Sequence, residues 1–242
     1  PAIPTNWKRP FVIMWIGQAL SLLGSQIVQF ALVWYLTRET GSATVLTTAT
    51  LVALLPQIFL GPIAGSIVDR GNRKRIMILA DSSVAISTIV LAVLFATGLI
   101  QIWHIYALML VRSLGSAFHQ PSFTASTSLM VPKDQLARVQ GFNQTLQGGL
   151  SIFSAPLGAL LLELLSEMQY VLAVDVVTAF LAVMSIVFIT IPQPERKVLA
   201  EGEKATSLWQ DTQAGFRYVL TWPGLMIILV MATLLNLLLT PA

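Results

Sequence analysis

Three ionisable residues, Asp81, Arg112 and Asp175, interrupt long runs of the sequence that are otherwise free of charge. Such runs are typical of membrane spans, in which a charged side chain is costly and faces the protein interior and a partner. Asp81 lies six residues beyond Arg75, about 9 Å along a helix, and Arg112 lies nearer the middle of the next run. We therefore predict an Asp81–Arg112 ion pair, which acts either as a packing clamp or in proton movement. Asp175 has no cation near it in the sequence, so it is either protonated or bonded to Ser or Thr neighbours.

Polar side chains repeat at helical spacing in three of the apolar runs. Such spacing places them on one face of a helix, and a polar face cannot be left against lipid. The faces comprise Gln18, Ser21, Ser25 and Gln29 in the first run, Arg112, Gly115, Ser116 and His119 in the fourth, and Gln140, Asn143, Gln144, Gln147, Ser151, Ser154 and Gly158 in the fifth. Interhelical hydrogen bonding would account for any one face, whereas three in one bundle favour a polar cavity. The candidates for a substrate cavity are Gln18, Ser21, Ser25, Gln29, Ser116 and His119.

The residue types needed for enzymatic or metal chemistry are scarce. The chain has no Cys, which excludes disulfides, thiolate metal sites and cysteine nucleophiles. His104 and His119 are fifteen residues apart on one predicted helix, a separation of about 22 Å that prevents them from sharing a metal. No nucleophile–base pair or phosphate-binding glycine loop stands out. We expect no metal, no cofactor and no enzymatic activity, and we place His104 at the outer membrane surface.

The elements that position these residues are long apolar helices. The 242 residues are 55% hydrophobic and only 10% charged, whereas soluble domains carry about 25% charged residues. This composition excludes a soluble enzyme, a disordered chain and a nucleic-acid-binding module. A membrane span needs about 20 apolar residues, and runs of that kind cover residues 10–37, 40–68, 76–98, 103–131, 139–162, 168–191 and 218–242.

We therefore predict an all-α polytopic membrane protein. Residues 1–191 form a six-helix bundle, residues 192–217 form a cytoplasmic linker, and residues 218–242 begin a seventh helix. Apolar residues from Thr206 onward predict an amphipathic helix in the linker. In this topology twelve of the fourteen Lys and Arg residues lie on one side of the membrane. Arg38 lies on the opposite side, and Arg112 lies within a span. The positive-inside rule then places the N-terminus in the cytoplasm of a multi-pass cell-membrane protein.

The turn between the second and third runs is the most distinctive local sequence. It reads Gly65-Ser66-Ile67-Val68-Asp69-Arg70-Gly71-Asn72-Arg73-Lys74-Arg75. Gly71 and Asn72 favour a tight turn because both tolerate positive φ. Asp69 stands at a helix C-terminus, where the helix dipole disfavours an anion, so we expect it to contact an arginine or another helix's N-terminus.

This turn resembles the signature between helices two and three of the major facilitator superfamily. The matching residues are Gly65, Asp69, Arg70, Arg73, Lys74 and Arg75. Arg112 with Gly115 resembles the helix-four arginine motif, and Gly149, Pro156 and Gly158 lie in a degenerate form of the helix-five antiporter motif. Residues 6–193 are similar to the macrolide-efflux branch of the drug:proton antiporters.

The resemblance implies two six-helix bundles around a cavity that opens alternately to each side. Helices one and four would line the cavity, Asp69 and Arg73 would latch its cytoplasmic side, and Arg112 would take part in proton coupling. The expected activity is export of hydrophobic, macrolide-like drugs by proton antiport. The expected partners are the lipid bilayer, a hydrophobic small molecule, protons and a C-terminal six-helix bundle that this sequence lacks, with no nucleic acid. The alternatives are a carrier for another small solute, by symport or uptake, and a non-transporting receptor or scaffold.

Overall fold

The computed structural model describes residues 6–193, 213, 217–218 and 220–239. The regular elements within them are all helices. They are α1 (Lys8–Thr40), α2 (Ala43–Arg70), α3 (Arg73–Ala96), α4 (Ile102–Met130), α5 (Lys133–Leu165), α6 (Met168–Val187) and α8 (Pro223–Leu239). The all-α prediction is therefore confirmed.

Five of these helices, α1, α2, α3, α5 and α6, are long and apolar enough to cross a membrane. Helix α4 has 29 residues, which is a sufficient length, but Arg112, His119 and several serines make it more polar. Helices α1–α6 belong to one compact unit, and α8 belongs to another. The predicted linker and its amphipathic segment lie almost wholly outside the described residues, so the proposed domain boundaries stay a prediction.

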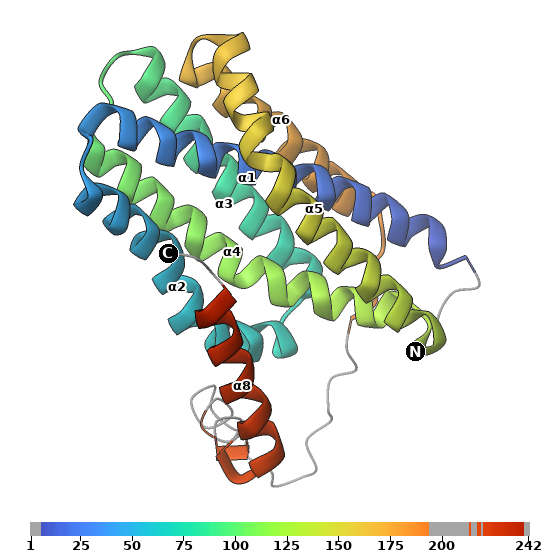
Figure 1. Ribbon diagram of the computed structural model, residues 1–242. Helices are drawn as coiled ribbons and strands as arrows, with labels where there is room; N and C mark the ends of the chain where they lie inside the picture. The colour runs from blue at the N-terminus through green and yellow to red at the C-terminus, as the bar shows by residue number, and fades with distance from the viewer. Residues whose placement is uncertain (1–5, 194–212, 214–216, 219, 240–242) are drawn as a thin grey trace, which may run out of the picture. The chain divides into compact units, whose positions relative to one another are not determined.

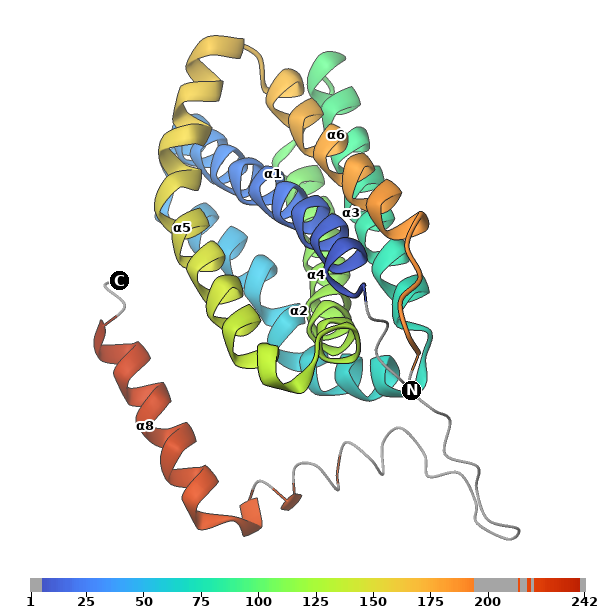
Figure 2. The same ribbon diagram turned by 90° about the vertical axis from the view of Figure 1, so that its right-hand side faces the viewer.

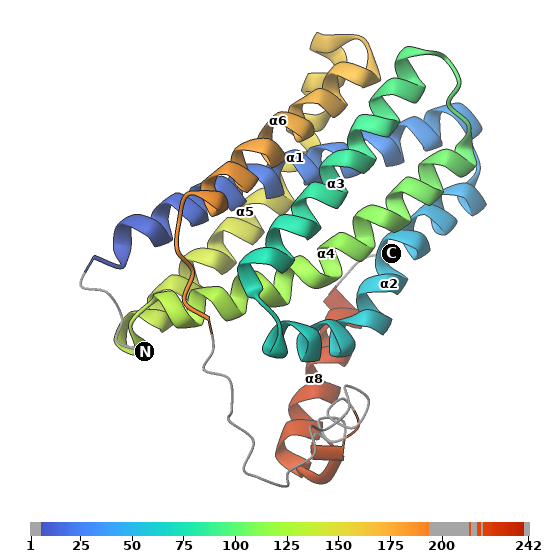
Figure 3. The same ribbon diagram turned by 180° about the vertical axis from the view of Figure 1, so that it is seen from behind.

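The six helices of the first unit run side by side (Figure 1). Helix α1 packs between α5 and α6, which flank it in Figure 2. Helix α3 packs between α6 and α4 (Figure 3), and α2 packs mainly against α4. This order brings α1, α3, α4 and α6 around one interior, to which each contributes the polar residues that interrupt its apolar sequence.

The interior consists of two apolar clusters with a polar region between them. One cluster, at the Thr40 end of α1, includes Leu32, Leu36, Ile105 and Leu172. The other, at the Lys8 end, includes Met14, Met77, Val131 and Ile186. Large apolar side chains such as Phe59, Leu79 and Phe188 cover the outside of the bundle and are at least 70% exposed. An apolar exterior around a partly polar middle is the arrangement expected of helices surrounded by lipid.

The turn between α2 and α3 has a different geometry from the predicted one. Gly71 and Asn72 have φ values of −92° and −80°, so the turn does not use the positive φ that both residues tolerate. Glycine is required for space, because a Cβ at Gly71 would lie 2.8 Å from the carbonyl oxygen of Ile67. Asn72 caps α3, since its side chain accepts a hydrogen bond of 3.0 Å from the backbone N–H of Arg75.

Lys74 ties the start of α3 to the end of α6. Its Nζ donates to the carbonyl oxygens of Val187 at 2.9 Å and Ile189 at 2.7 Å. A cation at a helix C-terminus satisfies carbonyls that have no partner within the helix. We expect Lys74→Met to lower the unfolding free energy by about 1 kcal/mol. Thermal unfolding of the detergent-solubilised full-length protein measures this, with Arg75→Met, at the exposed neighbouring residue, as the control. Equal effects of the two substitutions would contradict the prediction.

Candidate functional site

A polar pocket of about 180 Å³ lies among α1, α3, α4 and α5. Five of the six predicted cavity residues line it, namely Gln18, Ser21, Ser25, Ser116 and His119. Helix α3 contributes Asp81 to the wall, and α5 contributes the amides of Gln140, Asn143, Gln144 and Gln147. Gln29, the sixth candidate, is half-buried and is not among the residues that line this pocket.

Asp81 bonds Gln18 and His119, and we call these three residues the Asp81 triad. Gln18 Nε2 donates to Asp81 Oδ2 at 3.0 Å. His119 Nε2 lies 2.5 Å from Gln18 Oε1 and 3.3 Å from Asp81 Oδ1. Since both oxygens are acceptors, the geometry assigns a proton to Nε2 of His119. The triad joins α3, α1 and α4 at the pocket wall.

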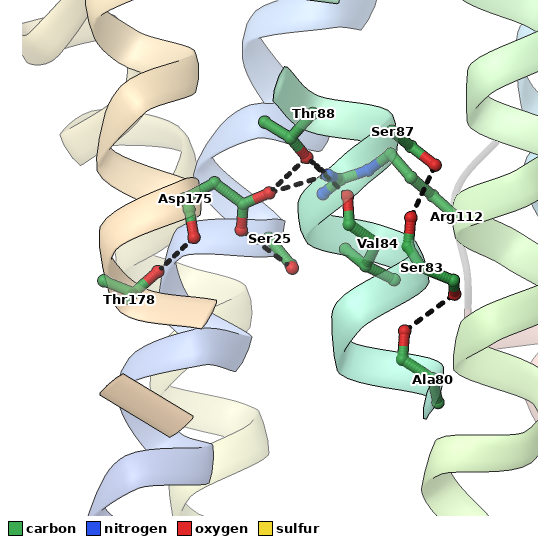
Figure 4. A network of polar contacts seen from close by, with 9 residues as sticks. All are labelled: Ser25, Ala80, Ser83, Val84, Ser87, Thr88, Arg112, Asp175 and Thr178. Carbon is green, nitrogen blue, oxygen red and sulfur yellow. Dashed lines mark hydrogen bonds and ion pairs between the residues drawn. The ribbon is translucent and has the colours of Figure 1, made fainter. Parts of the chain in front are cut away.

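The predicted Asp81–Arg112 ion pair is wrong, because Arg112 pairs with Asp175. Nη1 of Arg112 lies 2.6 Å from Asp175 Oδ2 and also bonds Thr88 Oγ1. The hydroxyls of Thr88 and Ser25 donate to the same carboxylate at 2.8 and 3.0 Å. Figure 4 shows Asp175 facing Ser25, Thr88 and Arg112. The alternative expectation for Asp175, bonding to Ser or Thr neighbours, is confirmed.

This second group, Asp175 with Ser25, Thr88 and Arg112, is here called the Asp175 network. One carboxylate on α6 accepts hydrogen bonds from α1, α3 and α4. The side chain of Asp175 has no exposed surface, and that of Arg112 is 8% exposed. A buried ion pair is tolerated when hydrogen bonds satisfy the remaining atoms of its members, as the two hydroxyls do for Asp175.

The Asp81 triad and the Asp175 network form two polar layers. On α1, α3 and α4, each triad residue lies seven residues from a network residue: Gln18 and Ser25, Asp81 and Thr88, His119 and Arg112. Seven residues complete nearly two helical turns, which keeps both positions on one face about 10.5 Å apart. The layers are therefore stacked along the same interior faces.

Trp15 is a pocket residue that the sequence reasoning missed. Its indole Nε1 donates to Asn143 Oδ1 at 2.7 Å and joins α1 to α5 across the pocket wall. The available signal was its position three residues before Gln18, which places both side chains on one face of α1.

The predicted helix-five residues separate into packed and open positions. A Cβ at Gly158 would lie 2.6 Å from Cδ1 of Phe30, so Gly158 allows α5 to approach α1. A Cβ at Gly149 would meet nothing within 4 Å. Pro156 lies inside α5 and is exposed. The structure therefore shows a packing role for Gly158.

The residues of the turn signature also lie in different environments. Arg73 is buried, and its Nη1 donates to the carbonyl oxygen of Ala125 on α4 at 2.8 Å. Asp69, with a side chain 74% exposed, lies 3.8 Å from Arg73 Nη2. The expected contact of Asp69 with an arginine is thus present. Lys74 holds the end of α6. Arg70 and Arg75 are exposed. A Cβ at Gly65 would meet nothing within 4 Å.

Comparison with known proteins decides the family. The model of the Major Facilitator Superfamily matches residues 14–241. The chain belongs to the Major Facilitator Superfamily. The family match confirms the resemblance based on the turn signature. The chain is therefore a multi-pass membrane protein of a transporter family. Among the residues that the structure describes, no group of three or more His, Asp or Glu residues could hold a metal ion.

Relatives in both Streptococcus pyogenes and Enterococcus faecalis carry the name Macrolide efflux protein A. The protein of Streptococcus pyogenes is 40% identical over 188 residues, which are 78% of this chain and 46% of that protein. The protein of Enterococcus faecalis is 37% identical over 153 residues, which are 63% of this chain and 47% of that protein. An uncharacterised MFS-type transporter of Bacillus subtilis, YkuC, is 29% identical over 153 residues, or 63% of this chain and 35% of YkuC. The chain spans about half the length of the macrolide efflux relatives that it matches.

Proposed function

We propose that the full-length protein exports hydrophobic, macrolide-like drugs in exchange for protons by alternating access, with its N-terminus in the cytoplasm. The observation that carries this proposal is the polar pocket beside a buried ion pair, in a bundle related to macrolide efflux proteins. A small molecule can be bound at the pocket, and a proton can change the charge of the Asp175 network, which shares Ser25 with the pocket lining.

A second six-helix bundle, following the linker, would complete the cavity. The pocket of about 180 Å³ is smaller than the roughly 300–1,000 Å³ of a drug-sized site, so one bundle supplies only one wall. In their most apolar stretches, α2 and α5 are 11% and 17% buried, against 44% in α1 and 33% in α3 and α6. This low burial supports α2 and α5 as the contact face for the second bundle. Asp69, exposed at the end of α2, would latch that face on the cytoplasmic side, with Arg73 holding it in place.

Proton coupling would act through the Asp175 network. Protonation of Asp175 would remove one charge of its pair with Arg112 and weaken the attraction between α4 and α6. Because the same carboxylate also bonds α1 and α3, its charge state influences how four helices pack. A proton arriving from outside could then favour the outward-open state and release of the drug.

Transport by the full-length protein in proteoliposomes tests the proposal. A labelled macrolide should be driven uphill by an imposed proton gradient, and a protonophore should abolish that accumulation. Protein-free liposomes provide the control. Macrolide movement that persists unchanged after the gradient collapses would contradict proton antiport, and gradient-driven movement of a different solute alone would favour another carrier activity.

Arg112→Ala tests the coupling role. We expect proton-driven macrolide transport to fall at least about fivefold, the scale of an ordinary coupling free energy between two sites, because Asp175 loses its charged partner. The comparison uses equal amounts of monodisperse protein, with Gln29→Ala, outside the pocket lining, as the control. Unchanged efflux by Arg112→Ala would exclude Arg112 from the coupling.

A further inference from the structure

We propose that Trp15 and Asn143 are positioning residues, whose hydrogen bond holds the pocket wall formed by α5 in the position in which it binds substrate. The inference rests on the proposed transport function, because it concerns the same pocket. It gives the bond a role in substrate affinity that is separate from the stability of the bundle.

Helix α5 is held more loosely than the other long helices of the pocket wall. Its most apolar stretch is 17% buried, against 44% in α1 and 33% in α3. Within the six-helix unit α5 packs mainly against α1, beside which it lies at the edge of the bundle (Figure 2). A wall with so few neighbours depends on each of its contacts for its position.

Two contacts fix α5 against α1. At the pocket, Trp15 Nε1 donates to Asn143 Oδ1 at 2.7 Å. Farther along, Gly158 meets Phe30 so closely that a Cβ would lie 2.6 Å from the ring. The two contacts are fifteen residues apart on both helices, a separation of about 22 Å. Without the first contact, the second still holds one end of α5, and the half that begins at Lys133 loses its polar attachment to α1.

The structure offers no substitute for the Trp15–Asn143 bond. Among the described residues, no other hydrogen bond joins α5 to another helix, and bonds such as that of Thr145 to the Gly141 carbonyl stay within α5. A Cβ at Gly141 or Gly148 would meet nothing within 4 Å, so no described neighbour opposes movement of α5 toward that side. The bond is therefore the contact that most directly sets the position of this wall.

The bond also determines which atoms Asn143 presents to a ligand. An indole N–H can only donate, so Oδ1 of Asn143 faces Trp15, and Nδ2 bonds Gln140 Oε1 at 3.4 Å. Nδ2 carries two N–H groups, and this bond uses one of them. Because Asn143 lines the pocket, the wall then offers an amide N–H to a carbonyl, ether or hydroxyl oxygen of the substrate.

Distances between spin labels test the positioning of α5 without any substrate. The described chain has no Cys, so labels are attached through two exposed substitutions, Arg9→Cys on α1 and Arg138→Cys on α5, as the only cysteines of the full-length protein. Trp15→Phe keeps an aromatic ring but removes the donor. We expect it to lengthen and broaden the distances between this pair, measured by pulsed electron–electron double resonance.

A second label pair provides the matched control at the other end of α5. Thr37→Cys on α1 and Leu164→Cys on α5 are also exposed and lie beyond the contact of Gly158 with Phe30. Distances between this pair should stay the same in Trp15→Phe, because that contact is intact. Equal changes at both ends would contradict a local role of the bond and would indicate general loosening of the bundle.

Transport kinetics test the role in binding. In proteoliposomes, Trp15→Phe should raise the macrolide concentration that half-saturates transport about fivefold, the scale of one hydrogen bond. The maximal rate should stay near that of the wild type, whereas simple loss of folded protein would lower it. Trp103→Phe, at an exposed tryptophan of α4, is the control. Absence of macrolide transport by the wild type would contradict the proposed function, while the spin-label distances still test the bond.

Asn143→Leu breaks the same bond from the α5 side. Because both substitutions remove one contact, the double variant with Trp15→Phe should displace α5 no further than either single variant. Asn143→Leu should raise the half-saturating concentration more than Trp15→Phe does, since it also removes the amide N–H. Thermal unfolding verifies that each variant is folded. Wild-type distances in both single variants, or wild-type half-saturation in Trp15→Phe, would overturn the inference.

Discussion

Asp175→Ala is expected to lower the unfolding free energy of the bundle by about 3–5 kcal/mol, the usual cost of removing one member of a buried ion pair. The substitution leaves the guanidinium of Arg112 buried without its carboxylate. It also removes the acceptor of the hydroxyls of Ser25 and Thr88. Because the carboxylate joins four helices, the loss affects the centre of the bundle as a whole.

A charge-free double variant provides the matched comparison. Arg112→Met combined with Asp175→Leu removes both charges and fills similar volume, so its stability should return close to that of the wild type. It should nevertheless lack proton-driven transport, because the titratable partner is gone. Thermal unfolding of the detergent-solubilised full-length protein measures all variants. If the single variant Asp175→Ala is as stable as the wild type, the Arg112–Asp175 pair does not hold the bundle together.

Gly24→Ala is expected to have the second largest effect, a loss of about 1–3 kcal/mol from overpacking. Gly24 lies where α1 meets α6. A Cβ at this position would lie 3.1 Å from Cα of Asp175, 3.2 Å from its Oδ1, and closer still to Oγ1 of Thr178. Relieving this steric overlap requires movement of the α6 backbone, which would displace Asp175 from Ser25 and Arg112. Small residues at such helix contacts allow close approach within a membrane.

The sign of this effect distinguishes packing from helix propensity. In an open helical position, alanine in place of glycine stabilises a helix by roughly 0.5–1 kcal/mol. Gly141→Ala on α5 is the control, because a Cβ there meets nothing within 4 Å. Thermal unfolding should therefore show destabilisation for Gly24→Ala and no loss for Gly141→Ala. Stabilisation by Gly24→Ala would contradict the close contact of α1 with α6.

Much of this fold and part of its pocket were predictable because their signals are local. The length and apolar content of each run determine whether it can cross a membrane, independently of its neighbours. Helical spacing likewise showed that Gln18, Ser21 and Ser25 share a face, and the pocket confirms it. The turn signature between α2 and α3 identified the superfamily from consecutive residues.

The sequence by itself thus determined the helices, their polar faces and the family, whereas the tertiary structure decided which charges are paired. Arg112 had two possible acidic partners, Asp81 and Asp175, and helical periodicity places all three in the interior without showing which helices are adjacent. Packing of α3 between α4 and α6 brings Asp175 to Arg112 and leaves Asp81 with Gln18 and His119. The physical reason is that spacing defines the face of one helix, while pairing depends on the order and vertical offset of several helices.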